Sequence, residues 1–380
     1  MKRFIELIHI AIGRKECFDT VPTPEEWQSL VETAQKQAMV GVVFSAIERL
    51  PKEQRPTRDI ILSLYMIVQR VEKSNALLTD RSVKVVRQFN EEGFEACILK
   101  GQGNALLYPE NLRCRRMSGD IDVWVLPKGY EAESENDAIR KVIEYIHKYT
   151  PGTKATYHHI DFPALKGVET EVHYRPAFLY TPYRDRRLQR WFIQNAATQF
   201  RNRRETDFGE ITMPTREFNI VFQLCHIYKH LFEEGVGLRQ LMDYYYVLRS
   251  TPVDETMQKD AVNIIKRSGM MRFARAVMWV LQEVYGMERE LQYVAADEKT
   301  GRLLLEEIEA TGNFGHMDTR FGDKSKESNW HRIVRVVSYD LKFFRYYPEE
   351  VIWNPLFKLY HWWWRKKMRE ESSFSRLKPL

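Results

Sequence analysis

Two aspartates separated by one residue, Asp120 and Asp122, are the first candidates for chemistry in this sequence. They begin the run Asp-Ile-Asp-Val-Trp-Val, in which acidic and apolar residues alternate at first. In a β-strand, side chains at positions i and i+2 share a face, so both carboxylates would point the same way. Adjacent carboxylates repel each other unless a cation lies between them, and oxygen ligands suit Mg²⁺ or Mn²⁺. The pattern predicts a metal-dependent phosphate-transfer site.

A second acidic run, residues 168–174, is also predicted to be a strand, with Glu169, Glu171 and His173 on one face. Two strands that carry three acids supply the ligands that a two-metal nucleotidyl transfer needs. We favour Glu171 over Glu169 as the third carboxylate because it begins the Glu-Val-His run; the alternative is that both are solvated. His173 would orient substrate, hydrogen-bond a carboxylate, or serve as a satisfied structural histidine.

A turn, Lys100-Gly101-Gln102-Gly103, follows the short apolar run 96–99. Backbone N–H groups in a tight turn bind phosphate oxygens, so Lys100 and the amides of Gly101 to Gly103 are candidate contacts for a triphosphate. Arg116 is the arginine nearest to the acids in sequence and is a further candidate for phosphate binding. Solvation at the surface is the alternative for this arginine.

The elements that must position these residues can be read from hydrophobic periodicity. Helical spacing predicts helices in residues 1–60 and over Ile60–Asn90. The next segments alternate: strands at 95–99 and 119–126, a helix at 129–148, and a hairpin formed by Thr156–Leu165 and Val168–Tyr174. After about residue 210 the pattern is helical. We therefore expect an α+β chain with an amino-terminal helical region (1–80), a core (81–212) and a helical carboxy-terminal domain (213–380).

The carboxy-terminal part adds weaker candidates for substrate contact. His226 and His230, four residues apart, share a helix face that would either line a cleft or pack the two imidazoles together. Zinc is disfavoured because the His-Glu-x-x-His pattern and a third ligand are missing. Arg239 and Asp243 have the spacing of a helix ion pair, or would point into the cleft.

The tail contains Trp362-Trp363-Trp364 followed by Arg365-Lys366-Lys367. Aromatic and basic residues together are typical of contacts with a membrane surface, a nucleic acid or another partner. However, three successive tryptophans cannot share one helical face. We therefore favour core packing followed by a solvated basic end, with the membrane or partner contact as the alternative.

Composition narrows the class of protein. The chain has 380 residues and a net charge of +6, which fits a phosphate-bearing partner but argues against long nucleic acid in the absence of a dense basic stripe. The 4 cysteines are scattered without a Cys-x-x-Cys pair, as expected in a reducing compartment. No secretory signal or apolar run long enough to cross a bilayer is evident. We expect a cytoplasmic protein with no transmembrane segment.

Several spaced motifs resemble one family. They are Leu99-Lys100-Gly101, the arginine-rich segment ending at Arg116, Gly119–Val125, Glu171–Arg175, His226–His230 and Leu238–Asp243. In this order they resemble the uncharacterised nucleotidyltransferase-like branch of the DNA polymerase β superfamily. The resemblance implies a small mixed β-sheet core, Asp120 and Asp122 as metal ligands, Glu171 as the third carboxylate, and a nucleoside triphosphate donor such as ATP. The superfamily's Gly-Ser turn is absent, because Gln102 follows Gly101.

These observations predict a nucleotidyltransferase that uses Mg²⁺ or Mn²⁺ to move a nucleoside monophosphate from a triphosphate to a hydroxyl group. The acceptor would be a small molecule or a protein. One alternative is a metal-dependent phosphohydrolase that uses the same acids. The other is a catalytically degenerate nucleotide-binding or interaction protein, which is motivated by the missing hydroxyl at Gln102.

Overall fold

The structure is a computed structural model that describes residues 1–130, 135–163, 167–233, 235–313 and 342–374, with the backbone alone for 367–374. The chain clusters into two compact units. Unit 1 comprises Met1–Leu77, Asn104–Ser118 and Asn219–Glu327, and unit 2 comprises Leu78–Gly103, Gly119–Phe218 and Ser328–Leu380. The polar sequence of residues 318–329 predicts a loop, and this segment lies outside the described residues.

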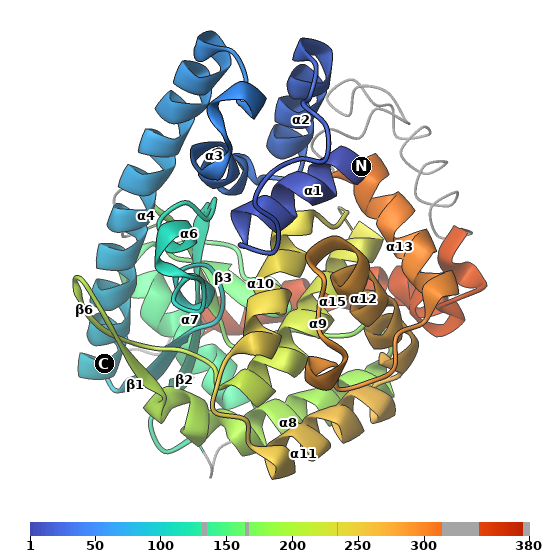
Figure 1. Cartoon of the computed structure of the whole chain (residues 1–380). Helices are drawn as coiled ribbons and strands as arrows, with labels where there is room; N and C mark the ends of the chain where they lie inside the picture. Colours follow the sequence, from blue (N-terminus) through green and yellow to red (C-terminus); the bar gives the residue numbers. More distant parts are fainter. Residues whose placement is uncertain (131–134, 164–166, 234, 314–341, 375–380) are drawn as a thin grey trace, which may run out of the picture. The chain divides into compact units, whose positions relative to one another are not determined.

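Unit 1 is helical in the residues that the structure describes (Figure 1). Its helices are α1 (Lys2–Ala11), α2 (Pro24–Lys36), α3 (Val40–Arg49), the first part of α4 (Arg58–Glu91), α6 (Glu110–Arg113), most of α9 (Arg216–Glu233), α10 (Leu238–Arg249), α11 (Glu255–Arg267), α12 (Met271–Tyr285) and α13 (Glu298–Thr311), with 3₁₀ turns at Lys52–Gln54 and Arg289–Leu291. The local sequence explains where two of these helices begin or end. Thr23 and Glu26 form a capping box at the start of α2, and Gly286 ends α12 in the left-handed conformation.

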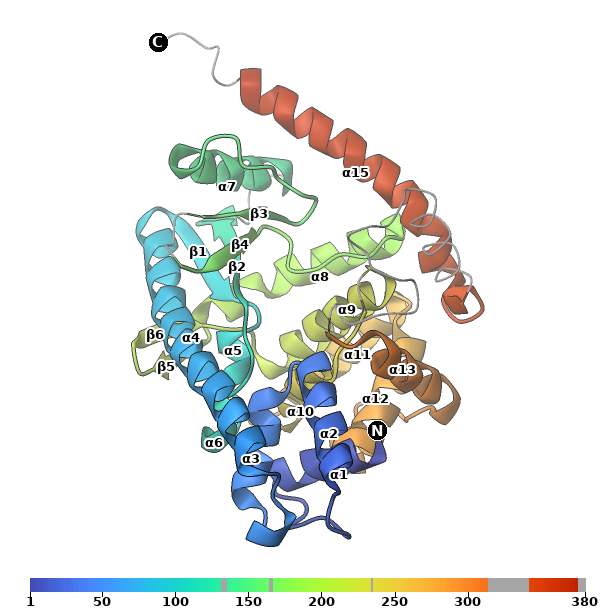
Figure 2. The same cartoon turned by 90° about the horizontal axis from the view of Figure 1, so that it is seen from above.

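Unit 2 contains a four-stranded mixed sheet of order β1-β2-β4-β3 (Figures 1 and 2). The strands are β1 (Phe94–Ile98), β2 (Asp120–Pro127), β3 (His159–Asp161) and β4 (Glu169–His173). β2 and β4 are parallel, whereas β1–β2 and β3–β4 are antiparallel. Around the sheet lie the end of α4, α7 (Glu135–Tyr149), α8 (Pro182–Arg201), α15 (Pro348–Phe374) and the two-stranded sheet of β5 (Arg203–Thr206) and β6 (Gly209–Thr212). The short α5 (Gln102–Ala105) spans the division between the units.

Apolar packing distinguishes the two faces of the sheet. On one face, Phe94 of β1 contacts Phe89 of α4 and Tyr145 of α7, with ring centroids 5.9 and 5.1 Å apart. On the other face, Trp124 of β2 is fully buried and packs on Phe200 and Phe218, with ring centroids 4.8 and 5.5 Å away. Buried aromatic rings contribute much of the area that stabilises such a core. The second face is therefore anchored at Trp124, which leaves the amino-terminal end of β2 for polar side chains.

The structure confirms the predicted fold class, an α+β chain with a small mixed sheet, flanking helices and a helical carboxy-terminal region. The predicted strands at 95–99 and 119–126 correspond to β1 and β2, and the predicted hairpin corresponds to β3 and β4. The helix predicted at 129–148 corresponds to α7. Residues 131–134 of the predicted range lie outside the described residues. The divisions at residues 80 and 212 stay predictions.

The tail forms the helix α15, and its tryptophans do not share one environment. Trp364 is 4% exposed, whereas Trp362 and Trp363 are 60% and 51% exposed. Core packing therefore holds for Trp364 alone, because successive residues of a helix point in different directions. Contact of the tail with a membrane surface or a partner stays a prediction. Among the described residues, no helix combines the length and apolar character needed to cross a bilayer. The cytoplasmic location also stays a prediction.

Candidate functional site

The antiparallel pairing of β1 with β2 brings the Lys100 turn beside the aspartates. Ile98 lies opposite Val123, and the N–H of Leu99 donates to the carbonyl of Asp122 at 2.9 Å. The chain then reverses at Gly101, whose φ of +63° is a conformation that glycine adopts without strain. A lysine that follows β1 is thus held next to carboxylates that begin β2.

The parallel pairing of β2 with β4 sets the acids in rows. Asp120 lies opposite Glu169, Asp122 opposite Glu171, and Trp124 opposite His173. Paired residues of neighbouring strands point to the same face, so the acids and His173 share the face that Trp124 occupies. Asp122 and Glu171, which are more than forty residues apart in sequence, become neighbours through this register.

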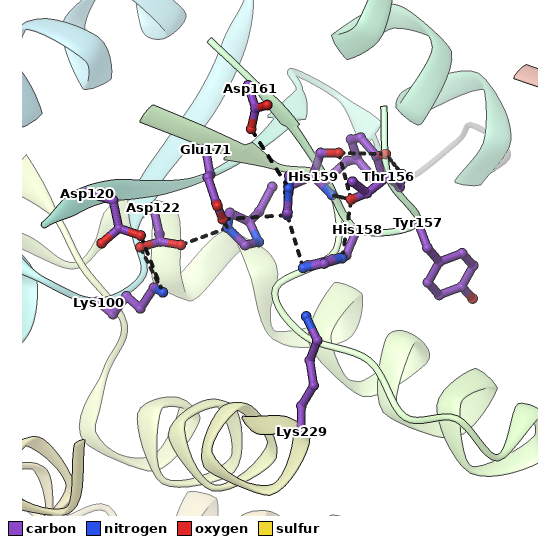
Figure 3. Close-up of polar contacts among 12 residues, drawn as sticks. Lys100, Asp120, Asp122, Thr156, Tyr157, His158, His159, Asp161, Glu171 and Lys229 are labelled. Atoms are coloured by element: carbon purple, nitrogen blue, oxygen red, sulfur yellow. Dashed lines mark hydrogen bonds and ion pairs between the residues drawn. The ribbon is translucent and has the colours of Figure 1, made fainter. Parts of the chain in front are cut away.

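The Lys100 ammonium lies between the two aspartates (Figure 3). Its Nζ is 3.2 Å from Asp122 Oδ2 and 3.8 Å from Asp120 Oδ2. Burial opposes the charge of Lys100, but the carboxylates of Asp122, Asp120 and Glu171 outweigh this effect and raise the pKa of its ammonium. The lysine therefore carries the positive charge that two adjacent carboxylates require.

His173 joins the two strands electrostatically. Its Nε2 lies 2.9 Å from Asp122 Oδ1 and 3.3 Å from Glu171 Oε2. Burial disfavours the charged imidazole, yet the hydrogen bonds to both carboxylates raise its pKa. In return, burial of Glu171 is outweighed by His173, His159 and Lys100, which lower the pKa of this carboxyl to about 2. We call Lys100, Asp120, Asp122, Glu171 and His173 the acid cluster.

Two histidines and an aspartate that sequence reasoning missed adjoin the acid cluster. His159 lies opposite His173 in the β3–β4 pairing, and its Nδ1 is 3.5 Å from Glu171 Oε2. His158 Nε2 is 3.0 Å from His159 Nδ1 (Figure 3). Asp161 follows on β3, 3.9 Å from His159 Nε2. Because His159 and Asp161 alternate along a predicted strand of a hairpin, their shared face was a signal that the sequence contained.

The donors in this region fit a divalent cation. Three sets of side chains each bring one ligand atom within 4.8 Å of the others: Asp122, Glu171 and His173; His159, Asp161 and Glu171; and His158, His159 and His173. Asp122 Oδ2 is buried, and its partner is the Lys100 ammonium at 3.2 Å, so a cation would bind this oxygen in place of the ammonium. Each set contains imidazole, which suits softer ions than carboxylate alone does.

The glycine turn has structural demands of its own. A Cβ at Gly103 would lie 3.1 Å from the carbonyl of Ile98, closer than side chains tolerate without a shift. The N–H of Gly103 already donates to the backbone carbonyl of Lys100 at 3.3 Å. Gln102 is buried and accepts a hydrogen bond from Thr79 at 3.2 Å. Binding of phosphate by this turn stays a prediction.

In unit 1, Arg116 and Asp243 form a buried ion pair. Arg116 donates to Asp243 Oδ1 and Oδ2 at 2.7 and 2.6 Å and to the Ser118 hydroxyl at 2.6 Å. Tyr108 also donates to Asp243, at 2.6 Å. Burial of Asp243 is outweighed by these partners, so its pKa is lowered. We call Arg116, Asp243, Tyr108 and Ser118 the arginine network; the sequence predicted binding roles for two of its members, and the structure gives both of them structural partners.

The other candidates of unit 1 also have partners. His226 and His230 pack edge to face on α9, with ring centroids 4.4 Å apart. Arg239 donates to the carbonyl of Met117. The packing interpretation of the two histidines thus has a geometric basis, whereas contact of these residues with substrate stays a prediction.

Residues 23–286 match the family described as "Uncharacterised nucleotidyltransferase". No curated protein matches the chain. Among solved structures, the antigenic nucleotidyltransferase-like protein from Paracoccidioides brasiliensis is similar over 60% of this chain and 96% of that chain, at 12% identity and a TM-score of 0.33. That likeness is too weak to bear on fold or function. The family match covers more than half of the sequence, and the chain belongs to the uncharacterised nucleotidyltransferase family.

Proposed function

We propose that the protein transfers a nucleoside monophosphate from a nucleoside triphosphate to a hydroxyl acceptor at the acid cluster. The observation that carries the proposal is the register of β2 with β4, which places Asp122 directly opposite Glu171. Membership of the family implies the triphosphate donor. The acceptor would be a small molecule or a protein.

Asp120, Asp122 and Glu171 would hold the divalent cation. When bound, such an ion lowers the pKa of the acceptor hydroxyl and stabilises the charge of the leaving pyrophosphate. The imidazoles of His159 and His173 beside the acids favour Mn²⁺ or a softer ion over Mg²⁺, because nitrogen ligands suit transition metals.

The chain's own groups then have separate tasks. His173 holds Asp122 and Glu171 in place through its Nε2. Glu171, with a pKa of about 2, accepts protons poorly near neutral pH and serves better as a ligand than as a general base. Lys100 would exchange the carboxylates for the triphosphate once a cation neutralises the acids, since an ammonium is a strong partner for phosphate.

Calorimetry with the four nucleoside triphosphates, each with Mg²⁺ or Mn²⁺, tests this proposal. We expect metal-dependent binding of at least one triphosphate, with loss of binding in D120N and D122N. E169Q is the matched control, because Glu169 is an exposed acid on the same face of the sheet. Wild-type binding by D120N and D122N, or no binding under any condition, would contradict the proposal.

The second candidate is a degenerate nucleotide-binding or interaction protein. The observation that favours it is the ion pair of Lys100 with Asp122, which already neutralises the carboxylate that a metal would use. In that case Lys100 is a permanent counter-ion, and addition of Mn²⁺ changes neither triphosphate binding nor thermal stability. A phosphohydrolase differs in its product: with ATP and Mn²⁺ it releases inorganic phosphate, whereas the transferase releases pyrophosphate and a modified acceptor.

A further inference from the structure

A second region of unit 2 has the properties of a ligand site. A cavity of about 580 Å³ lies among the helices α7, α8 and α15 and the segment after β4. Pockets of a few hundred cubic ångströms are the size that binds small molecules. Residues 182, 185, 186, 189, 190 and 193 line the cavity. Their helical spacing shows that they belong to one face of α8.

The cavity is distinct from the acid cluster, although the same strands support both. Tyr157 lines the cavity, and its ring points away from His158, His159 and Glu171 (Figure 3). Arg175, which follows His173 by two residues, lines the cavity as well. Consecutive residues of an extended segment point to opposite sides, which explains how Tyr157 and His158 serve two different places.

Three arginines give the cavity a positive character. Arg175 is buried at its wall, where its guanidinium lies 4.0 Å from the ring centroid of Tyr157 and its Nε is 2.5 Å from Glu135. Arg186 and Arg190 are exposed, one turn apart on α8. Neither has an ion pair with the described residues, whereas Arg184 of the same helix is 2.7 Å from Glu349. Two guanidinium groups at the cavity are therefore available to an anion.

Asp185, the acidic residue on the same face of α8, does not neutralise the arginine charges that a ligand would meet. Asp185 is buried, and its carboxylate accepts hydrogen bonds from the Tyr157 hydroxyl at 2.8 Å, the Leu179 N–H at 3.0 Å and the Gln189 side chain at 2.9 Å. These partners satisfy both carboxylate oxygens within the protein.

Glu135 also lines the cavity, and its carboxylate is paired with Arg175. Apart from Asp185, the charged groups of the lining that have no ion pair with the described residues are therefore Arg186 and Arg190.

Aromatic rings form the remaining wall. Phe357 of α15 lies edge-on to Tyr157, with ring centroids 5.2 Å apart. Tyr360, one turn further along α15, also lines the cavity and is half-exposed. A half-exposed ring beside a packed aromatic group offers a flat apolar surface on which another ring can stack.

We propose that this cavity binds a small anion that carries a flat ring, with a phosphate or carboxylate on Arg186 and Arg190 and the ring against Tyr360 and Phe357. Guanidinium groups match the geometry of both anions, so the charged group is defined as a class. The proposal is independent of nucleotidyl transfer.

Titration calorimetry of the full chain with 1-naphthyl phosphate, 1-naphthoate, 1-naphthol and inorganic phosphate tests the proposal. We expect saturable binding of naphthyl phosphate or naphthoate, with naphthol and inorganic phosphate each weaker by about tenfold or more, because each lacks one of the two recognised parts. The stronger of the two naphthyl anions identifies the charged group. Failure of both anions to bind saturably would overturn the proposal.

Variants locate the binding. R186Q/R190Q should weaken the better naphthyl anion by about tenfold or more, because charge-assisted hydrogen bonds are lost. R187Q, an exposed arginine of the same helix that does not line the cavity, is the matched control and should bind as the wild type does. D120N should also retain binding, which separates this site from the acid cluster. Undiminished affinity in R186Q/R190Q, or equal loss in R187Q or D120N, would refute the assignment.

Discussion

The acid cluster of unit 2 and the arginine network of unit 1 are built from similar residue types but differ in how completely their charges are satisfied. Both oxygens of Asp243 accept hydrogen bonds from Arg116, and both side chains are at most 5% exposed. In the acid cluster, Asp122 Oδ2 is paired with the Lys100 ammonium at the longer distance of 3.2 Å, and the side chain of Asp120 is 39% exposed. A buried ion pair with every oxygen hydrogen-bonded is typical of a structural role, whereas a more exposed and more loosely paired group can bind a ligand.

The comparison predicts its largest effect at Asp243. D243A leaves the Arg116 guanidinium buried without its counter-charge, which costs about 3–5 kcal/mol when a buried pair is broken. D120A removes a half-exposed carboxylate and should change the free energy of unfolding by less than about 1 kcal/mol. Urea denaturation followed by circular dichroism measures both variants. If D243A unfolds at the wild-type urea concentration, the arginine network is not the stabilising pair that we infer.

A smaller effect is expected at Lys100. K100M in EDTA leaves Asp122 buried without its ammonium partner and should lower the free energy of unfolding by about 1–3 kcal/mol. Saturating Mn²⁺ should restore most of this loss, because the ion supplies the missing positive charge. Thermal unfolding with and without Mn²⁺ measures the effect. K84M is the control, since Lys84 pairs at 2.7 Å with Asp80 at a more exposed position. Equal responses of both variants to Mn²⁺ would remove the cation site from the acid cluster.

The smallest effect concerns pH in the metal-free protein. The lowered pKa of Glu171 contributes stability that is present above its ordinary pKa of 4.5 and is lost as pH falls toward about 2. The raised pKa of His173 contributes stability that is present below 6.5 and is lost as pH rises through the folded-state value. In EDTA, the wild type should therefore have its highest melting temperature between about pH 5 and 6.5.

Two variants separate these contributions. H173Q should remove the loss of stability above pH 6.5, because no imidazole is left to lose a proton beside the carboxylates. H147Q is the control, because His147 lies outside the acid cluster and contacts a backbone carbonyl, that of Thr153, at 2.9 Å. A profile for H173Q that keeps the wild-type decline above pH 6.5 would show that another group causes it.

Much of the site's scaffold was accessible from local patterns. Alternation placed Asp120 with Asp122, and Glu171 with His173, on common faces of predicted strands, and the structure has strands in both places. The same reasoning could have identified His159, since it alternates with Asp161 before the hairpin turn. Local sequence patterns could not show that Arg116 and Asp243 are partners, because their ion pair joins segments far apart in sequence. The predicted roles of Arg116 in phosphate binding and of Asp243 in a cleft were therefore made without knowledge of this pair.

The sequence by itself determined the class of fold, the main strands and helices, and which side chains of each strand share a face. These properties follow from periodicity and steric preference within short segments. Only the tertiary structure decided that Lys100 lies between two aspartates, that His173 bridges Asp122 and Glu171, and that Arg116 is paired with Asp243. Such partners depend on strand register and burial, and burial sets the strength of every charge interaction.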